Sequence, residues 1–312
     1  VLLQSLGLDP TDEAVEACSP WRFREPLSPD MAARREGREI DFATLVDFCR
    51  DAEKGPEDVL LCEGIGGAMT VDAQGTVTDL AVDDIKRYWP RAWGEDAWTW
   101  SVANLSAGRV NEARARVRLK VDGGGGVQVE SINGEMDLDG VTVDYLAPMP
   151  KVTGISGQAT FDKTRFDIFV LSGETFGLRI REGSIFFTGL DQYDQFADIQ
   201  LLIDGPVQDA MKLIEHEPLG FSSIIGIDPA RTSGQATTRL KLDFIVEKAL
   251  TQDQVDVSAT SEMTDVAITD AVLGQNVSAE KLALSVDKTG LDVSGGIMLG
   301  DIPATLEWRQ NF

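Results

Sequence analysis

The sequence predicts a mainly β protein: an extended, curved antiparallel sheet, groove-like or taco-like, with a few short helices, preceded by an incomplete α/β segment. More than a dozen stretches alternate apolar and polar residues, as strands with one buried face do. Glycines separate these stretches at turn-like intervals. The five residues Ser156–Thr160 return unchanged at Ser233–Thr237, which suggests a sheet extended by similar units.

Charge and composition exclude several classes of function. The chain carries a formal net charge of −24 over 312 residues and has no basic patch. We therefore expect no nucleic acid partner, because phosphate binding needs clustered lysines and arginines. No apolar run reaches the roughly 18 residues of a membrane span, and no secretory signal opens the chain. We expect membrane association only through flanking regions outside these residues.

The first seventy residues have the pattern of an α/β segment. An acidic pair after a threonine predicts a capped helix over Thr11–Ala17, and Asp41 is the expected cap of a second helix, Phe42–Glu53. The unalternating apolar run Asp58–Cys62 predicts a strand of a parallel sheet that is covered on both faces. A glycine-rich turn, Glu63–Gly67, follows at the strand end where ligand sites of α/β proteins form.

Three motifs of this segment resemble dethiobiotin synthetase, an ATP-dependent enzyme of biotin synthesis. They are Trp21–Pro29 (WRFREPLSP), Glu36–Arg38 (EGR) and Leu61–Gly67 (LCEGIGG). The resemblance covers residues 1–70. It implies that Glu63 helps to hold the catalytic Mg²⁺, and it places Ser28, Gly66 and Gly67 in the substrate site.

The segment departs from that family at the phosphate site. The family begins with a glycine-rich loop that carries a lysine, and no G-x-x-x-x-G-K-[ST] occurs in this chain. We therefore expect no catalysis, and ATP and Mg²⁺ as cofactors only if the synthetase part were complete. The alternative function is a carbon–nitrogen ligase of this kind. We expect the parent protein of residues 1–70 to be cytoplasmic.

A tryptophan-rich segment, Asp83–Gly108, opens the second region, residues 71–312. We expect it to be helical and divided into two short helices at Pro90. Two interpretations are open: the helices pack on a sheet end, or the aromatic side chains form a lip near lipid headgroups. Four of the six tryptophans lie here: Trp89, Trp93, Trp98 and Trp100.

Strands dominate from Ala113 onward, interrupted by one expected helix, Val207–Glu215. The expected strands are Ala115–Val121, Val127–Val129, Met136–Leu138, Val141–Tyr145, Phe166–Val170, Leu178–Ile180, Ile185–Phe187, Ile199–Ile203, Leu240–Ile245, Val255–Ala259, Val266–Ile268, Leu282–Val286, Leu291–Val293 and Thr305–Trp308. The glycines expected at turns are Gly140, Gly173, Gly183, Gly189, Gly205, Gly274, Gly290 and Gly300.

The two faces of these strands differ in polarity. Leu240, Leu242 and Phe244 alternate with charged residues, and Leu282, Leu284 and Val286 alternate with alanine and serine. A sheet with one apolar face must bury it under a second layer, close on itself or offer it to lipid. Two convincing helices are too few to cover such a face. We predict a trough with an apolar lining, and a plain sheet core is the alternative.

The second region resembles the AsmA-like envelope proteins of Gram-negative bacteria, in particular the YhdP type. The matching residues occur in the family's order: Tyr88–Pro90, Trp100, Asn104–Leu105, Gly108–Arg109, Val143–Leu146, Pro148, Pro150, Gly157, Phe161, Gly205–Val207, Pro218–Leu219, Ser233–Ala236, Leu240–Leu242, Leu291, Gly295, Pro303–Ala304 and Trp308.

The resemblance implies a non-enzymatic role in phospholipid transport between inner and outer membrane. Its expected partner is phospholipid, bound along an apolar β groove that contains the six residues Leu240 to Val286 named above. The expected location of the parent protein is the periplasmic face of the inner membrane. A further hypothesis is that the chain joins two unrelated reading frames.

Other candidate sites have little support in the sequence. His216, the single histidine, has no second histidine or nucleophile near it in the chain, so it is expected to be an ordinary surface residue. The acidic pairs Asp83–Asp84 and Asp191/Asp194 lack the Asp-x-Asp-x-Asp-Gly pattern of a calcium loop.

Overall fold

The computed structural model describes residues 9–24, 29–52, 69–89, 91, 94–121, 127–219, 226–247, 250–272 and 274–312. The chain divides into two compact units. One comprises Val1–Gly75 and Arg116–Ser131, and the other comprises Thr76–Ala115 and Ile132–Phe312. Each unit is described by itself below.

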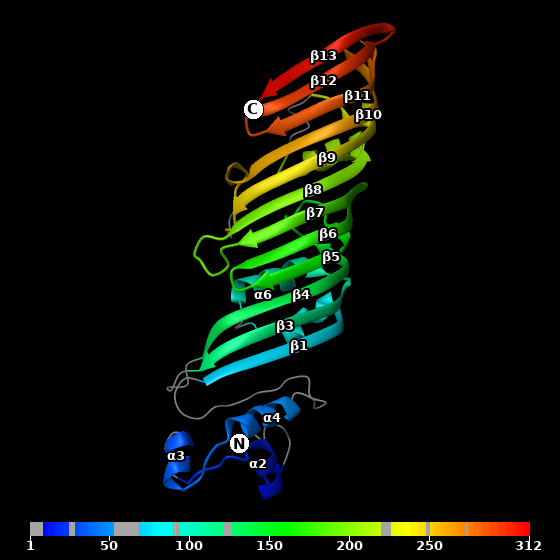
Figure 1. The fold of residues 1–312 in the computed structure, drawn as a ribbon. Helices are drawn as coiled ribbons and strands as arrows, with labels where there is room; N and C mark the ends of the chain where they lie inside the picture. The colour runs from blue at the N-terminus through cyan, green and yellow to red at the C-terminus, as the bar shows by residue number, and fades with distance from the viewer. Residues whose placement is uncertain are drawn as a thin grey trace. The chain divides into compact units, whose positions relative to one another are not determined.

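The described part of the first unit contains three short helices, α2 (Asp12–Cys18), α3 (Pro29–Arg35) and α4 (Phe42–Ala52) (Figure 1). The backbone N–H of Ala14 donates to the Thr11 hydroxyl over 3.2 Å, and that of Thr44 donates to the Asp41 carboxylate over 3.0 Å. These bonds satisfy N–H groups that have no partner within the helix. Both predicted helix starts are confirmed.

The strands pair in chain order in one open antiparallel sheet of 13 strands, with the short β2 on β4. They are β1 (Met69–Ala81), β2 (Leu105–Ser106), β3 (Arg109–Val121), β4 (Val127–Val143), β5 (Val152–Asp162), β6 (Arg165–Thr175), β7 (Leu178–Thr188), β8 (Phe196–Pro206), β9 (Thr232–Ile245), β10 (Asp256–Val272), β11 (Gln275–Asp287), β12 (Gly290–Leu299) and β13 (Ile302–Asn311). The mainly β fold is confirmed.

Short connections make neighbouring strands of this sheet antiparallel. The sequence Asp-Lys-Thr forms the turn twice, between β5 and β6 and between β11 and β12. The Asp162 carboxylate accepts bonds from the N–H and the hydroxyl of Thr164, each 2.7 Å long, and Asp287 accepts the same two bonds from Thr289. Such Asx turns reverse the chain within two residues.

The strands are longer than the sequence predicted. Leu178–Ile180 and Ile185–Phe187 belong to the single strand β7, and Val255–Ala259 and Val266–Ile268 both belong to β10, which begins at Asp256. Gly140, Gly173, Gly183 and Gly205 lie inside strands, so their prediction as turns was wrong. At Gly183 the reason is packing: a Cβ atom there would lie 2.5 Å from Cδ2 of Leu201 on the next strand.

Four short helices accompany the sheet in the described part of the second unit. They are η1 (Val82–Asp84), α5 (Ile85–Tyr88), α6 (Glu95–Asn104) and α7 (Val207–Glu215), with further single turns η2 (Pro229–Arg231) and η3 (Gln252–Gln254). The predicted helix Val207–Glu215 is confirmed. The segment after α6 is the short strand β2, where Leu105 pairs with Val143, and not helix as predicted.

The buried core of the second unit lies where α7 packs on the sheet. Val207 of α7 joins buried residues of four strands, and Met211 packs against the same cluster. The strand residues of the cluster are Ala236, Met263, Val266, Ala279, Leu282, Leu291 and Val293. All the described helices are short, so α7 covers one end of β9–β12 and leaves the strand centres without a helical layer.

Candidate functional site

The six residues predicted for a lipid groove lie on one face of the sheet. Leu240 and Leu242 of β9 stand in register with Ala259 and Val257 of β10, and Ala259 stands opposite Val286 of β11. Strand side chains alternate between faces, so Phe244, Leu282 and Leu284 share this face. We call it the apolar face.

The apolar face continues across the strands that precede β9. The cross-strand row through Leu242 contains, in register, Ile199, Ile185, Ile168, Ala159 and Met136. A second row begins at Phe244 and contains Ala197, Phe187, Phe166 and Phe161. Phe166 and Phe187 stack with ring centroids 6.4 Å apart, and Phe161 meets Phe166 edge-on at 6.4 Å. The sequence alone did not show that these residues form rows.

The row through Leu242 is long enough for an acyl chain. From Met136 on β4 to Val257 on β10 it crosses six strand spacings, or about 29 Å at about 4.8 Å per strand. Each leaflet of a bilayer holds acyl chains over about 15 Å, half of the hydrocarbon thickness. A continuous apolar surface of this length can therefore accommodate a whole acyl chain.

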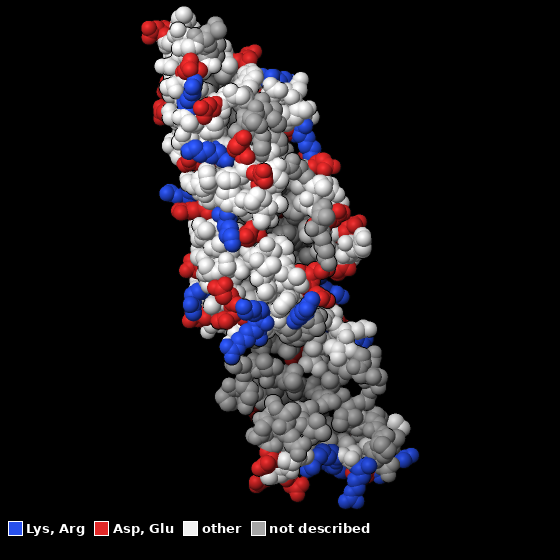
Figure 2. Space-filling model, turned by 180° about the vertical axis from the view of Figure 1, so that it is seen from behind, with Lys and Arg blue, Asp and Glu red and all other residues white. Residues whose placement is uncertain are grey.

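Exposure distinguishes two parts of the apolar face. Leu282, close to α7 and the core cluster, is 4% exposed. Leu240, Leu242 and Phe244 are only half-buried, and Val257 is 36% exposed. Seen from behind in Figure 2, the second unit shows broad uncharged areas between its charged side chains. The open part of this face exposes apolar surface that water solvates poorly.

The tryptophan-rich segment has an inner and an outer side. Trp98 of α6 is half-buried beneath the Arg91 guanidinium, 5.5 Å from its ring centroid, whereas Trp100 is 47% exposed. Tyr88 at the end of α5 is also exposed. The position of Trp98 fits packing of the helix on the sheet. The exposed side chains of Trp100 and Tyr88 are also compatible with an aromatic lip near lipid headgroups.

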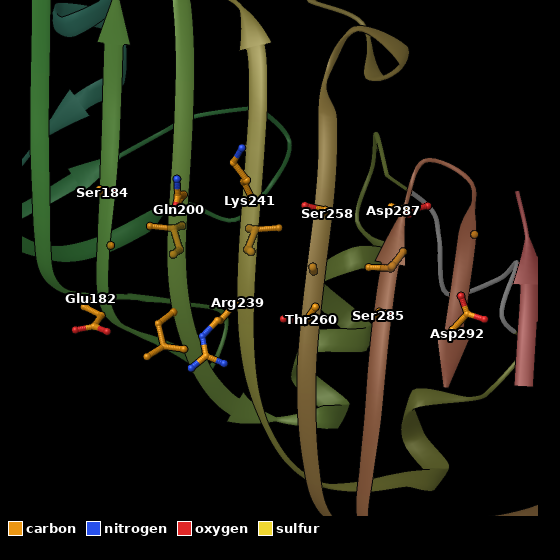
Figure 3. Close-up of a pocket in the computed structure, with 17 residues that line it drawn as sticks. Glu182, Ser184, Gln200, Arg239, Lys241, Ser258, Thr260, Ser285, Asp287 and Asp292 are labelled. Atoms are coloured by element: carbon orange, nitrogen blue, oxygen red, sulfur yellow. The ribbon is translucent and has the colours of Figure 1, made fainter. Parts of the chain in front are cut away.

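A depression of about 640 Å³ lies on the opposite, polar face of the sheet. Figure 3 shows its side chains arranged on neighbouring antiparallel strands, with α7 behind the sheet. The labelled residues that line it are Glu182, Ser184, Gln200, Arg239, Lys241, Ser258, Thr260, Ser285, Asp287 and Asp292. Sequence reasoning missed this site. Alternation of apolar and polar residues predicts one apolar face and one polar face, and the polar residues are then expected only to be solvated.

The predicted synthetase residues Glu63, Ser28, Gly66 and Gly67 lie outside the described residues, as does the predicted strand Asp58–Cys62. Within the described ranges, no group of three or more His, Cys, Asp or Glu side chains is arranged to hold a metal ion. His216 follows α7 and meets the ring of Phe176 edge-on at 5.0 Å.

A comparison with protein families gives a match over most of the chain. The model of the YhdP protein family matches residues 62–310, which is most of the chain. The chain belongs to the YhdP family. This membership supports a lipid-transport type of protein, of a family associated with the cell envelope. Among the described helices, none is long and apolar enough to cross a membrane.

A second similarity concerns a different class of protein. ATP-dependent dethiobiotin synthetase BioD of Acidiphilium cryptum is 48% identical over 81 residues, 25% of this chain and 36% of that protein. The enzymes of Methylobacterium nodulans and Legionella pneumophila (strain Paris) are 45% identical over 80 residues and 39% over 68. The chain thus spans about a third of the length of these curated relatives. No solved structure matches the chain.

Proposed function

We propose that this protein binds phospholipid by its acyl chains along the apolar face and takes part in phospholipid transport between the inner and outer membranes, at the periplasmic face of the inner membrane. The observation that carries the proposal is the open part of that face. Leu242 stands between Ile199 and Val257 in a continuous apolar row, and α7 packs over one end of β9–β12. Family membership supports the same class of function.

An acyl chain on this face replaces water next to apolar side chains on two or more strands. The gain is about 25 cal/mol for each Å² of apolar surface removed from water. No hydrogen bond along the row fixes the chain at one position, because the side chains of the row through Leu242 are aliphatic. A lipid held in this way can slide from strand to strand at little cost, which suits transport more than storage.

Photo-crosslinking tests the proposal without placing a charge in the sheet. A benzoylphenylalanine at position 242 should crosslink to phospholipid in cells, detected by mass spectrometry of the purified protein. The matched control is position 260 on β10, where Thr260 is exposed on the polar face. Equal labelling at both positions, or none at 242, would contradict the proposal. Leu242→Asp should also abolish lipid binding, provided that circular dichroism shows an intact sheet.

The similarity to dethiobiotin synthetase supports a second candidate, an ATP- and Mg²⁺-dependent ligase in which Glu63 holds the metal. The test is ATP-dependent formation of dethiobiotin by the purified chain and by Glu63→Ala. Absence of product, or an activity that Glu63→Ala leaves unchanged, removes this candidate. Sequencing the coding DNA across Gly67–Gly75 decides whether the two parts are encoded as one reading frame.

A further inference from the structure

The depression on the polar face consists of two adjacent cross-strand rows. In one row Leu202, Arg239, Thr260 and Ser285 stand in register on β8 to β11, with Glu182 on β7 and Asp292 on β12 at the two ends. In the other, Ser184, Gln200, Lys241 and Ser258 stand in register on β7 to β10. Cations lie near the middle, carboxylates at both ends, and hydroxyls between them (Figure 3).

Several of these groups already have partners within the protein. The Lys241 ammonium lies 2.8 Å from the carboxylate of Asp243, and the Gln200 amide donates to Asp198 over 2.9 Å. Asp292 lies 3.8 Å from the Arg309 guanidinium. These pairs hold the edges of the depression in place.

Arg239 differs from Lys241, the other cation that lines the depression. Among the described residues its guanidinium donates no hydrogen bond, and Glu262, which is paired with Lys281, interacts with it only electrostatically. The hydroxyls of Thr260 and Ser285, next to it in the row, also form no hydrogen bond among these residues. A guanidinium offers five N–H donors in a planar fork that matches a carboxylate or phosphate. The centre of the depression therefore holds guanidinium N–H donors and hydroxyls that no hydrogen bond among the described residues uses.

The surroundings restrict the chemistry of that ligand. Leu202 is the one large apolar side chain of the two rows. The other large apolar residues of the lining, Leu201, Leu240 and Val286, belong by strand alternation to the apolar face. The polar face therefore offers an acyl chain little to pack against. Glu182 and Asp292 flank Arg239, and they would repel a polyanion. A shallow site of hydroxyls, one amide and one free guanidinium suits an extended polyol that carries a single acidic group.

We propose that the depression binds an oligosaccharide in which neutral sugars flank a sugar that carries a carboxylate. The carboxylate pairs with Arg239, and Thr260, Ser285 and Ser258 exchange hydrogen bonds with sugar hydroxyls along the rows. This site lies on the face opposite the proposed lipid surface. It does not depend on the lipid proposal, and each can fail without the other.

Isothermal titration of the full chain with two probes tests the proposal. A hyaluronan trisaccharide with one glucuronate between two N-acetylglucosamines carries a single carboxylate, and chitotriose has the same length without it. The hyaluronan probe should bind more tightly, and Arg239→Gln should weaken its binding roughly tenfold, the usual effect of losing a hydrogen bond to a charged group. Arg239→Gln should leave the weaker binding of chitotriose unchanged.

Arg181→Gln is the matched control. Arg181 lies on β7, where its guanidinium is 3.2 Å from Asp204, and it does not line the depression. This variant should bind the hyaluronan trisaccharide as the original chain does. A second variant, Thr260→Val, removes a hydroxyl and keeps a β-branched side chain in the strand; it should weaken binding of both probes. The proposal is overturned by absence of binding at millimolar probe, by equal affinity for both probes, or by binding that neither variant changes.

Discussion

The side chain of Leu201 on β8 packs over Gly183 of the neighbouring strand β7. A Cβ atom on Gly183 would be 2.5 Å from Leu201 Cδ2. The two residues are directly opposite each other on β7 and β8. The same relationship joins Gly295 of β12 to Leu282 of β11, where the distance would be 2.8 Å. Glycines on the apolar face therefore make room for large side chains of adjacent strands, which lie flat over the sheet and form continuous rows.

We expect Gly183→Ala to destabilise the protein by about 1–3 kcal/mol, the usual cost of adding a methyl group to a packed site. Gly296→Ala in β12 is the control, because a Cβ atom there would meet nothing within 4 Å. Without a clash, replacing glycine in a strand stabilises by about 0.5–1 kcal/mol. Urea unfolding of the two variants measures both effects, and equal midpoints would contradict the role of Gly183.

Leu282→Ala and Leu242→Ala should differ in cost. Leu282 is 4% exposed in the core cluster beneath α7, so its truncation should cost about 2–5 kcal/mol. Leu242 is half-buried on the open part of the face. Because it already contacts water, its truncation should cost about 1 kcal/mol. Equal losses in urea unfolding would show that a further layer covers Leu242 in solution.

The two Asp-Lys-Thr turns should make stability depend on pH in the acid range. Hydrogen bonds from the backbone N–H and then the hydroxyl of Thr164 hold the pKa of Asp162 below its ordinary value of 3.8. The Thr289 hydroxyl and then its N–H do the same for the pKa of Asp287. A carboxylate with a lowered folded pKa stabilises the fold above pH 3.8, and this stabilisation is lost as the pH falls through the folded value.

The test is a double variant, Asp162→Asn with Asp287→Asn. It should be less stable than the original chain at neutral pH, and the difference should shrink as the pH falls below 3.8, as followed by urea midpoints. Asp191→Asn, in the loop between β7 and β8, is the control and should not reproduce the loss of stability at neutral pH. A difference that persists at low pH would mean that the two carboxylates do not act through their charge.

Trp98 and Trp100 should respond differently to substitution. The indole Nε1 of Trp98 is buried without a hydrogen-bond partner among the described residues. Trp98→Phe removes an unsatisfied donor, whose burial costs about 1–3 kcal/mol, and this offsets the lost packing. We expect the melting temperature of Trp98→Phe to change little, and a large loss would reveal a partner for Nε1.

Trp100→Ala, at a residue 47% exposed, should change stability by at most about 0.5 kcal/mol. If its side chain belongs to a lip near lipid headgroups, the same variant should bind phospholipid vesicles more weakly in a flotation assay. Unchanged flotation would leave packing as the role of this segment.

The sequence by itself determined the local features of this chain. The caps Thr11 and Asp41, the helix Val207–Glu215 and the alternation around Leu242 depend on residues close together in the chain. Their energies are fixed by neighbours three or four residues away, or by the two-residue period of a strand. For the same reason the sequence indicated an open sheet with one apolar face.

Only the tertiary structure decided where strands continue, which rows they form and what covers them. In the sequence, Gly183 has the spacing of a turn residue. In the structure it lies inside β7, because Leu201 of β8 fills the space that the missing side chain leaves. Arg239 looks like any exposed cation in the sequence, and only the register with β8 and β10 places its guanidinium in the depression. Register sets these relationships, and a shift of one residue would move Leu242 and Arg239 to the opposite faces.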